Sequence, residues 1–423
     1  MTGYRPRLID SELDELLAGV PAVAIEGPKA VGKTSTALQR ARTVYRLDDP
    51  GERSVLYADP GRLATGAPPV LIDEWQRLTT SWDVVRRAVD VDPSPGRFLL
   101  TGSASPRATT HSGAGRIVTA RMRPLTLFER GIAQPTVSLR DLLTGRGPQI
   151  GGDSVVTLQG YVEEICASGF PALRGLTGRA LRAQLDGYLD RIVDHDIPEL
   201  GRAVRNPVVL RRWLAAYAAA TATTTGFERI RDAATSDEGA KPARSSTMPY
   251  RDALERLWIL DPLPAWLSTR NRLSRLATPV KHHLADPALA ARLLRVGPEA
   301  LLAAEPGGIA VPRDGTLLGA LFESLVTLDL RVYAQACEAA TSHLRTRAGE
   351  HEVDLIIERD DGRVLAVEVK LVADPGPRDL QHLHWLRGQL QDDLLDAVVV
   401  TTGRHAYRRP DGIAVVPAAL IGP

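Results

Sequence analysis

The chain has 423 residues, of which 44% are hydrophobic and 24% charged, and its formal net charge is +1. This length exceeds one ordinary core and predicts two or three domains, and the hydrophobic content excludes a disordered chain. The balanced charge gives no global attraction to nucleic acid, so DNA binding would need a local basic surface. The candidate surface, which is equally a solvated helix face, contains Arg202, Arg205, Arg211 and Arg212.

Cysteine usage and hydropathy exclude further classes of protein. Cys166 and Cys337 lie far apart without metal-ligand spacing, so neither a zinc site nor a disulfide framework is expected. No secretory signal and no uninterrupted run of about 18 apolar residues is found. We therefore expect a cytoplasmic protein without a membrane partner.

Lysine is rare in this sequence, and its positions are informative. The basic residues include only five lysines: Lys29, Lys33, Lys241, Lys281 and Lys370. A chain that otherwise uses arginine should keep lysine mainly where a guanidinium cannot replace an ammonium. Lys33 and Lys370 both lie in motifs that need an ammonium, which predicts one active centre near each end.

Residues 1–135 alternate apolar strands with amphipathic helices, which predicts a parallel sheet covered by helices on both faces. A strand-like stretch at residues 23–25 leads into a phosphate-binding motif of the form G-x-x-x-x-G-K-T. In such a loop the backbone N–H groups surround phosphate oxygens, Lys33 reaches the β- and γ-phosphates, and Thr34 ligates Mg²⁺. The motif predicts that ATP and Mg²⁺ bind at Gly27, Pro28, Lys29, Ala30, Val31, Gly32, Lys33 and Thr34.

Two further strands should end beside this loop. The apolar run at residues 69–72 ends in Asp73, which would hold Mg²⁺ directly or through water, and Glu74, which would orient or deprotonate the attacking water. The run at residues 97–100 is followed by Thr101 and Ser103. We expect Thr101, or as second choice Ser103, to sense the γ-phosphate; an ordinary Gly-Ser loop is the alternative.

The order of motifs then resembles a known family. After the loop, the acid strand and Thr-Gly-Ser come Gly-Arg at residues 115–116 and Pro-Leu-x-x-x-Glu at residues 124–129. This order is similar to that of bacterial and archaeal AAA-type P-loop ATPases with an uncharacterised C-terminal region. The resemblance implies an AAA-type P-loop NTPase domain over residues 1–135. It also makes Arg116 a candidate finger that completes a neighbouring subunit's nucleotide site, with a solvated surface arginine as the alternative.

Residues 134–135 and a Gly-rich run at residues 145–152 mark the exit from the first domain. The middle region, assigned to residues 136–305, is rich in Ala, Leu and Arg and has a helical pattern. A helical lid followed by a winged-helix-like piece is expected here. The stretches at residues 169–171, 188–197 and 279–287 also match the family, but they indicate kinship rather than chemistry.

Residues 306–423 predict a second α/β unit with its own polar centre. Strands at 352–358 and 363–370 flank a turn at Asp361, so Asp354 and Glu368 should lie opposite each other. Lys370 would share a face with Glu368 because strand side chains alternate. An upstream amphipathic helix carries Glu323 as a further acid.

This constellation resembles the PD-(D/E)xK nuclease motif. The resemblance implies a restriction-endonuclease-like domain in which Glu323, Asp354 and Glu368 bind Mg²⁺ and Asp354, Glu368 and Lys370 are catalytic. The alternative is an ordinary ion pair between Glu368 and Lys370 on a strand. Charges on an otherwise apolar strand are costly without partners or metal, which keeps catalysis open.

Together these motifs predict an ATP-binding and ATP-hydrolysing protein that acts on DNA through a nuclease-like domain. An ATP-regulated switch or interaction protein, whose nuclease-like domain binds a partner without cleaving it, is the alternative. A nucleotide-binding protein with negligible turnover ranks third. The sequence leaves open the physiological trigger, the nucleic-acid surface, the oligomeric state, and the choice among DNA, a protein and a second copy as partner.

Overall fold

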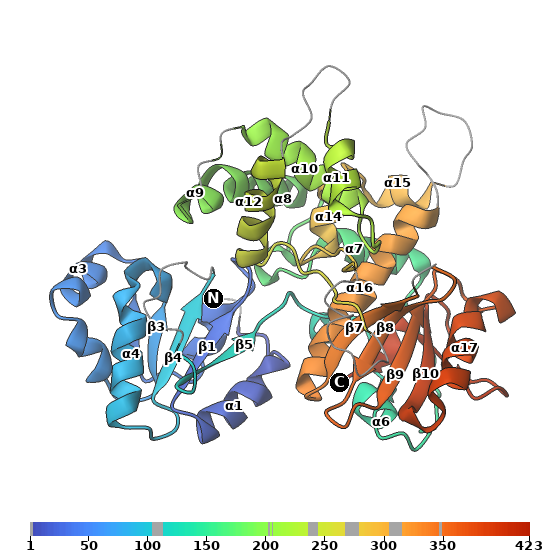
Figure 1. Ribbon diagram of the computed structural model, residues 1–423, viewed down its shortest axis with the longest axis horizontal. Helices are drawn as coiled ribbons and strands as arrows, with labels where there is room; N and C mark the ends of the chain where they lie inside the picture. Colours follow the sequence, from blue (N-terminus) through green and yellow to red (C-terminus); the bar gives the residue numbers. More distant parts are fainter. Residues whose placement is uncertain are drawn as a thin grey trace.

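A computed structural model describes residues 3–103, 113–201, 204, 206–235, 244–266, 279–303, 315–346 and 349–423. Figure 1 shows an N-terminal α/β part in blue, a helical part in green and yellow, and a C-terminal α/β part in orange and red. Two arginines of the candidate basic surface, Arg202 and Arg205, lie outside the described residues. So does Lys241.

The N-terminal part is a five-stranded parallel sheet with the strand order β2-β3-β4-β1-β5. Alternate residues of β1 enter two different hydrophobic clusters, so both faces of the sheet are covered, as expected. The strands are β1 (Ala22–Glu26), β2 (Thr43–Arg46), β3 (Val70–Asp73), β4 (Phe98–Gly102) and β5 (Ile117–Arg121). The helices are α1 (Ile9–Gly19), α2 (Lys33–Leu38), α3 (Pro50–Ala58) and α4 (Thr80–Val91). Because all five strands run the same way, the residues that follow β1, β3 and β4 meet at one edge.

The regular secondary structure of the described residues between 158 and 303 is helical, and their only strand-like pairings are single β-bridges. The helical interpretation is therefore confirmed, while the winged-helix-like piece stays a prediction. The helices are α7 (Leu158–Ala167), α8 (Gly178–Arg191), α9 (Ile197–Glu199), α10 (Pro207–Ala219), α11 (Phe227–Ala233), α12 (Arg244–Arg256), α14 (Pro287–Leu293) and α15 (Pro298–Leu302). A π-helical segment, η4 (Ile192–Asp196), joins α8 to α9.

The C-terminal part is a six-stranded mixed sheet with the order β11-β12-β10-β9-β8-β7. It contains α16 (Gly315–Ala336), β7 (Ala340–Arg345), β8 (Glu352–Glu358), β9 (Val364–Val369), α17 (Gln381–Leu390), β10 (Leu394–Thr401), β11 (Tyr407–Arg408), β12 (Ala414–Pro417) and β13 (Ile421–Gly422). Strands β8 and β9 pair antiparallel with Leu355 opposite Val367. This register is centred on Asp361, as the sequence predicts.

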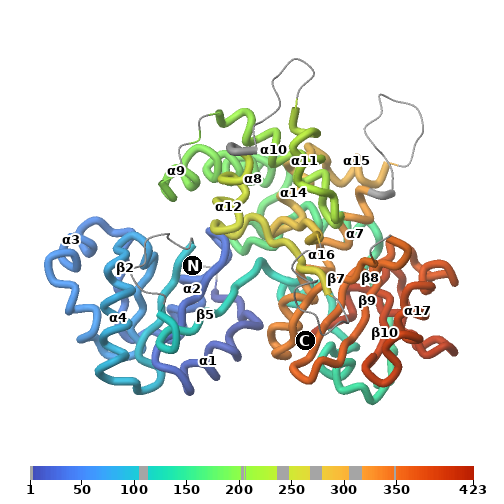
Figure 2. The backbone as a smooth tube through the Cα atoms, viewed as in Figure 1, coloured from blue at the N-terminus to red at the C-terminus, as the bar shows by residue number. Residues whose placement is uncertain are grey.

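The chain crosses from the N-terminal part to the C-terminal part before it enters the helices. After α5 (Leu127–Arg130), the short strand β6 (Val137–Ser138) pairs with β13, and α6 (Leu139–Leu142) contacts α16. Figure 2 shows this green-cyan segment among the orange and red elements. The boundaries near residues 135 and 305 stay predictions.

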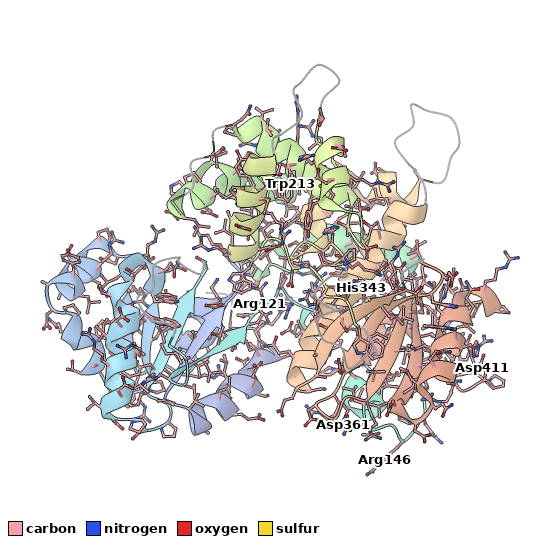
Figure 3. The ribbon with its side chains drawn as sticks, in the orientation of Figure 1. Arg121, Arg146, Trp213, His343, Asp361 and Asp411 are labelled. Atoms are coloured by element: carbon pink, nitrogen blue, oxygen red, sulfur yellow. The ribbon has the colours of Figure 1, made fainter. Side chains whose placement is uncertain are left out.

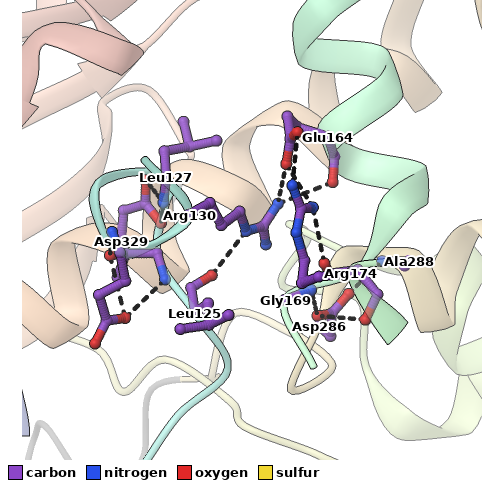
Figure 4. A network of polar contacts seen from close by, with 12 residues as sticks. Leu125, Leu127, Arg130, Glu164, Gly169, Arg174, Asp286, Ala288 and Asp329 are labelled. Carbon is purple, nitrogen blue, oxygen red and sulfur yellow. Dashed lines mark hydrogen bonds and ion pairs between the residues drawn. The ribbon is translucent and has the colours of Figure 1, made fainter. Parts of the chain in front are cut away.

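Figure 4 shows a buried polar network where the three parts meet. The Arg130 guanidinium donates to the Leu125 carbonyl at 2.9 Å and to the Glu164 carboxylate of α7 at 3.0 Å. Asp286 caps α14 through the Ala288 N–H at 2.8 Å and accepts a second bond from the Gly169 N–H at 2.6 Å. The motifs around residues 124–130, 169–171 and 286–287 therefore join the parts of the fold. No helix in the described part of the chain combines the length and apolarity needed to cross a membrane.

Candidate functional site

The phosphate-binding motif forms a tight loop between β1 and α2. Gly32 adopts φ +109°, and α2 begins at the next residue. A Cβ atom on Gly27 would lie 2.2 Å from the carbonyl oxygen of Met122, just after β5. Glycine is therefore required at position 27 because the loop backbone lies against the end of a neighbouring strand.

Lys33 is a buried cation held by neutral groups of the same loop. Its Nζ donates to the carbonyl oxygens of Gly27 and Pro28, both at 2.8 Å, and the residue is 5% exposed. Burial lowers the pKa of Lys33 to about 8, while Glu74 and Asp73 act in the opposite direction. A desolvated ammonium at the start of a helix fits an anionic phosphate group, which would be a stronger acceptor than the carbonyls.

Asp73 brings the loop and the two neighbouring strands together. Its Oδ1 accepts a bond from the Thr34 hydroxyl at 2.7 Å and another from the Thr101 hydroxyl of β4. Hydroxyl and carboxylate oxygens are ligands that suit Mg²⁺. Thr34 and Thr101, which the sequence assigned to the metal and the γ-phosphate, therefore both contact Asp73, the other predicted metal ligand.

Glu74 follows in a left-handed conformation, with φ +55°, which directs the chain sharply away from β3. Its Oε2 accepts bonds from the Gln76 amide at 2.5 Å and from the Ser103 hydroxyl at 3.2 Å. The Thr101 hydroxyl thus donates to the carboxylate of Asp73, and the Ser103 hydroxyl donates to that of Glu74. Gln76 was not singled out from the sequence, and its place two residues after Glu74 gave no motif to find it by.

Arg116 lies far from this chain's own phosphate loop. Strand β5 pairs in register with β1, with Ile117 beside Ala22, so Arg116 lies at the amino-terminal edge of the sheet. The loop lies at the other edge, a strand of five residues or about 17 Å away. The Arg116 guanidinium pairs with Asp90 at 2.7 Å. The assignment of Arg116 to a neighbouring subunit's site stays a prediction.

A second lysine of the loop reaches the helical part of the protein. The Nζ of Lys29 donates to Asp196 at 2.6 Å and lies 3.5 Å from Glu199. Glu199 also accepts a bond at 3.1 Å from Arg77, which lies three residues after Glu74. Asp196 and Glu199 were not predicted as site residues. They are about 170 residues away from Lys29 in the sequence, and only folding brings them into contact with it.

The C-terminal acids also converge. The Asp354 Oδ2 accepts a bond from the Val369 N–H at 2.9 Å, and the Lys370 ammonium lies 2.7 Å from Glu368 and 4.0 Å from Asp354. Glu323 projects from α16 to the same cluster. Burial, followed by repulsion from Asp354, raises the pKa of Glu368 well above its ordinary value and that of Glu323 to about 8.

Lys281 completes this cluster. It is fully buried, and its Nζ lies 2.8 Å from Glu323, 3.0 Å from Asp354 and 3.3 Å from Glu352. In the sequence, the stretch that contains Lys281 indicated kinship only, and Glu352 was not predicted as a site residue. The scarcity of lysine was a signal that pointed to Lys281 as well.

Three segments of the chain match protein-family models. Residues 20–130 match the AAA domain. This matched segment, called the AAA domain below, contains the phosphate loop and strands β1 to β5. Residues 158–300 and 318–421 match two domains of unknown function, DUF8612 and DUF4143. Because neither of these two family models names a fold or an activity, the restriction-endonuclease-like fold stays a prediction.

Whole-chain relatives are similar over nearly the full length. The uncharacterized proteins Rv2008c of Mycobacterium tuberculosis and Mb2031c of Mycobacterium bovis are each 25% identical over 422 residues, which cover 97% of this chain and 83% of the relative. The Walker-type ATPase paby2304 of Pyrococcus abyssi aligns with 67% of this chain and 94% of its own, at 15% identity and a TM-score of 0.38.

The AAA domain meets the rest of the protein at the end of β5. Figure 3 labels Arg121 at this junction, where its guanidinium lies over the Trp258 ring at 3.7 Å from the centroid. Asp261, just beyond α12, lies 2.8 Å from Arg123, 3.1 Å from Arg331 of α16 and 3.8 Å from Arg121. One carboxylate therefore joins the AAA domain to the longest helix of the C-terminal part.

Proposed function

We propose that this protein is a Mg²⁺-dependent ATPase that works as an ATP-regulated switch, with its helical part reading the state of the nucleotide site. The observation that carries the proposal is the contact of Lys29, a residue of the phosphate loop, with Asp196 of the helical part. The loop also touches that part through the Tyr188 hydroxyl, which donates to the Lys29 carbonyl at 3.3 Å.

Bound ATP with Mg²⁺ would supply the phosphoanhydride bond that is broken and the charge that the site must stabilise. Lys33 would transfer its hydrogen bonds from the loop carbonyls to phosphate oxygens, and Thr34 and Asp73 would hold the metal ion. Glu74 would orient the attacking water and accept its proton, with Gln76 and Ser103 fixing the carboxylate. Thr101 would contribute a hydroxyl beside Asp73.

The switch follows from a competition for Lys29. Its side chain is about one-third exposed and its ammonium is bound to Asp196, while phosphate oxygens in the loop would be strong alternative acceptors. A ligand shifts a conformational equilibrium only through different interactions with the two states. Transfer of Lys29 from Asp196 to phosphate would provide that difference, releasing η4 and α9 from the AAA domain when ATP is bound.

Phosphate release by wild-type protein, Lys33→Ala and Lys29→Met, measured with and without DNA, tests the proposal. Lys33→Ala should abolish release.

Asp196→Asn should raise hydrogen exchange in residues 192–199 without ATP, toward the level that ATP produces in the wild type. The matched control is Asp194→Asn in the same segment, because Asp194 pairs with the surface residue Arg211 instead. Equal exchange in wild type and Asp196→Asn would refute the switch.

Action on DNA through the C-terminal cluster is a second candidate function. It is favoured by the meeting of Glu323, Asp354, Glu368 and Lys370 in one buried cluster. Divalent-metal-dependent DNA cleavage that is lost in Lys370→Ala, while ATP turnover persists, would support it. If wild-type protein never cleaves DNA, the interaction role remains. DNA, a protein and a second copy of the chain are all proposed partners, and size-exclusion chromatography with and without ATP tests the last.

A further inference from the structure

The C-terminal cluster already contains a cation that belongs to the chain. Lys281 extends into it from the segment before α14, while Glu323 comes from α16 and Glu352 and Asp354 come from β8. Its Nζ lies between 2.8 and 3.3 Å from one oxygen of each of these three carboxylates. Carboxylate oxygens that converge from separate elements on one point form the arrangement in which proteins hold hard divalent cations.

We infer that Lys281 is a built-in substitute for a divalent metal ion: its ammonium occupies the cation position of the C-terminal cluster and keeps the cluster free of metal. Removal of this side chain should then create a site for Mg²⁺ or Mn²⁺ from oxygens already in place. The inference rests on the carboxylate cluster and does not depend on ATP hydrolysis. While Lys281 is in place it predicts no divalent-metal-dependent cleavage of DNA by this cluster, so such cleavage would require the ammonium to leave first.

Glu368 provides an independent observation of unused ligand capacity. Its side chain is 2% exposed, and only its Oε2 is bound, by Lys370 at 2.7 Å. Its Oε1 is buried and has no hydrogen-bond partner among the described residues. A buried carboxylate oxygen without a donor is costly, and its coordination to a cation would relieve that cost.

The formal charge of the cluster supports the same reading. Four carboxylates, from Glu323, Glu352, Asp354 and Glu368, face two ammonium groups, from Lys281 and Lys370, so the cluster would carry −2 if every group were ionised. Because burial raises the pKa of Glu368 and Glu323, bound protons offset part of this charge. Replacement of Lys281 by a neutral side chain would leave −3. Removal of one partner from a buried ion pair is strongly destabilising, so this charge should draw in a divalent cation.

The position of Lys281 is coupled to the junction with the AAA domain. Its backbone N–H and C=O both pair with Leu263, at 2.9 and 2.8 Å. Leu263 follows two residues after Asp261, which Arg123 of the AAA domain binds. A shift of this short paired segment would therefore withdraw the ammonium of Lys281 from the cluster. Rotation of the Lys281 side chain alone would not easily do so, because the side chain is buried.

The test measures Mn²⁺ binding to the nucleotide-free protein by electron paramagnetic resonance, in the wild type and in two variants. Lys281→Met removes the ammonium and keeps the length of the side chain. The double variant Lys281→Met with Glu352→Gln also removes the most exposed carboxylate, so its formal cluster charge stays at −2, as in the wild type. Asp354→Asn added to either variant is the control that separates this site from metal bound at the phosphate loop.

We expect both variants to bind one Mn²⁺ more tightly than the wild type by at least about tenfold, and Asp354→Asn to abolish the gain. Thermal unfolding should show Lys281→Met destabilised in chelator and restored by Mn²⁺, because a ligand of the native state stabilises it. Equal Mn²⁺ affinity in wild type and variants would overturn the inference. So would folded variants that bind no extra ion, or variants that stay unfolded both with and without Mn²⁺.

Discussion

Asp261 offers the sharpest test of how the AAA domain is held to the rest of the protein. Its carboxylate lies 2.8 Å from Arg123 and 3.1 Å from Arg331, and it is 14% exposed. Burial alone would raise its pKa, but the guanidinium groups of Arg123, Arg331 and Arg121 hold the pKa of Asp261 well below its usual range. The replacement Asp261→Asn keeps the shape and removes the charge.

The expected cost is large because three guanidinium groups lose their shared counter-charge in a buried place. Burial lowers the pKa of Arg121 to about 9 and that of Arg331 to about 10 even with Asp261 present. A pair about 4 Å apart in a medium of effective dielectric near 20 interacts by about 4 kcal/mol, and breaking one partner of a buried pair costs about 3–5 kcal/mol. For an unfolding unit of 150–250 residues, this corresponds to a fall in Tm of about 6–20 °C.

Scanning calorimetry, with tryptophan fluorescence as a second probe, measures the change. Trp258 stacks on Arg121 and should report loss of the junction. The matched control is Asp361→Asn, since Asp361 pairs with Arg359 and Arg363 in an exposed turn and should barely affect Tm.

The pH dependence of this difference has a definite sign. A carboxyl group whose pKa is lower in the folded state stabilises the protein above its unfolded pKa of about 3.9. That stabilisation disappears as the pH falls from about 4 toward the folded pKa. The gap in Tm between wild type and Asp261→Asn should therefore shrink in acid. A gap of only a degree or two at pH 7 would refute the assignment of Asp261 as the clamp of this junction.

Three further predictions concern the nucleotide site and the core. Gly27→Ala should abolish ATP binding in a calorimetric titration, because its Cβ would lie 2.2 Å from the Met122 carbonyl; Gly175→Ala, with no atom within 4 Å, should bind normally. Glu74→Gln should keep ATP binding but lower kcat by about 10²–10⁴-fold if this carboxylate is the general base, and unchanged turnover would contradict that role. Burial raises the pKa of Asp329 to about 8, so the folded state keeps a proton that the unfolded state loses, and this residue's contribution to stability should fall between pH 4 and 8. Asp329→Asn should flatten that slope in urea unfolding measured across this range, and an unchanged slope would count against it.

The sequence predicted the elements whose signal is local. The phosphate loop, the acid strand and the third strand could be placed because each motif depends on backbone geometry within a few residues, and parallel strands bring their carboxyl ends to one edge. The hairpin register could also be predicted, since a turn centred on Asp361 fixes which residues lie opposite.

Contacts between distant segments could not be derived from the sequence. Lys29 meets Asp196 across 167 positions, and Lys281 meets Asp354 across 73. Periodicity and spacing report which face of one element is buried, but they carry no information on which other element covers it. The amino-acid sequence alone thus determined a phosphate-loop motif and a C-terminal set of acids. Only the tertiary structure decided that the phosphate loop is bound to the helical part and that an ammonium fills the acid cluster, because burial and charge pairing between remote segments arise when the chain is packed.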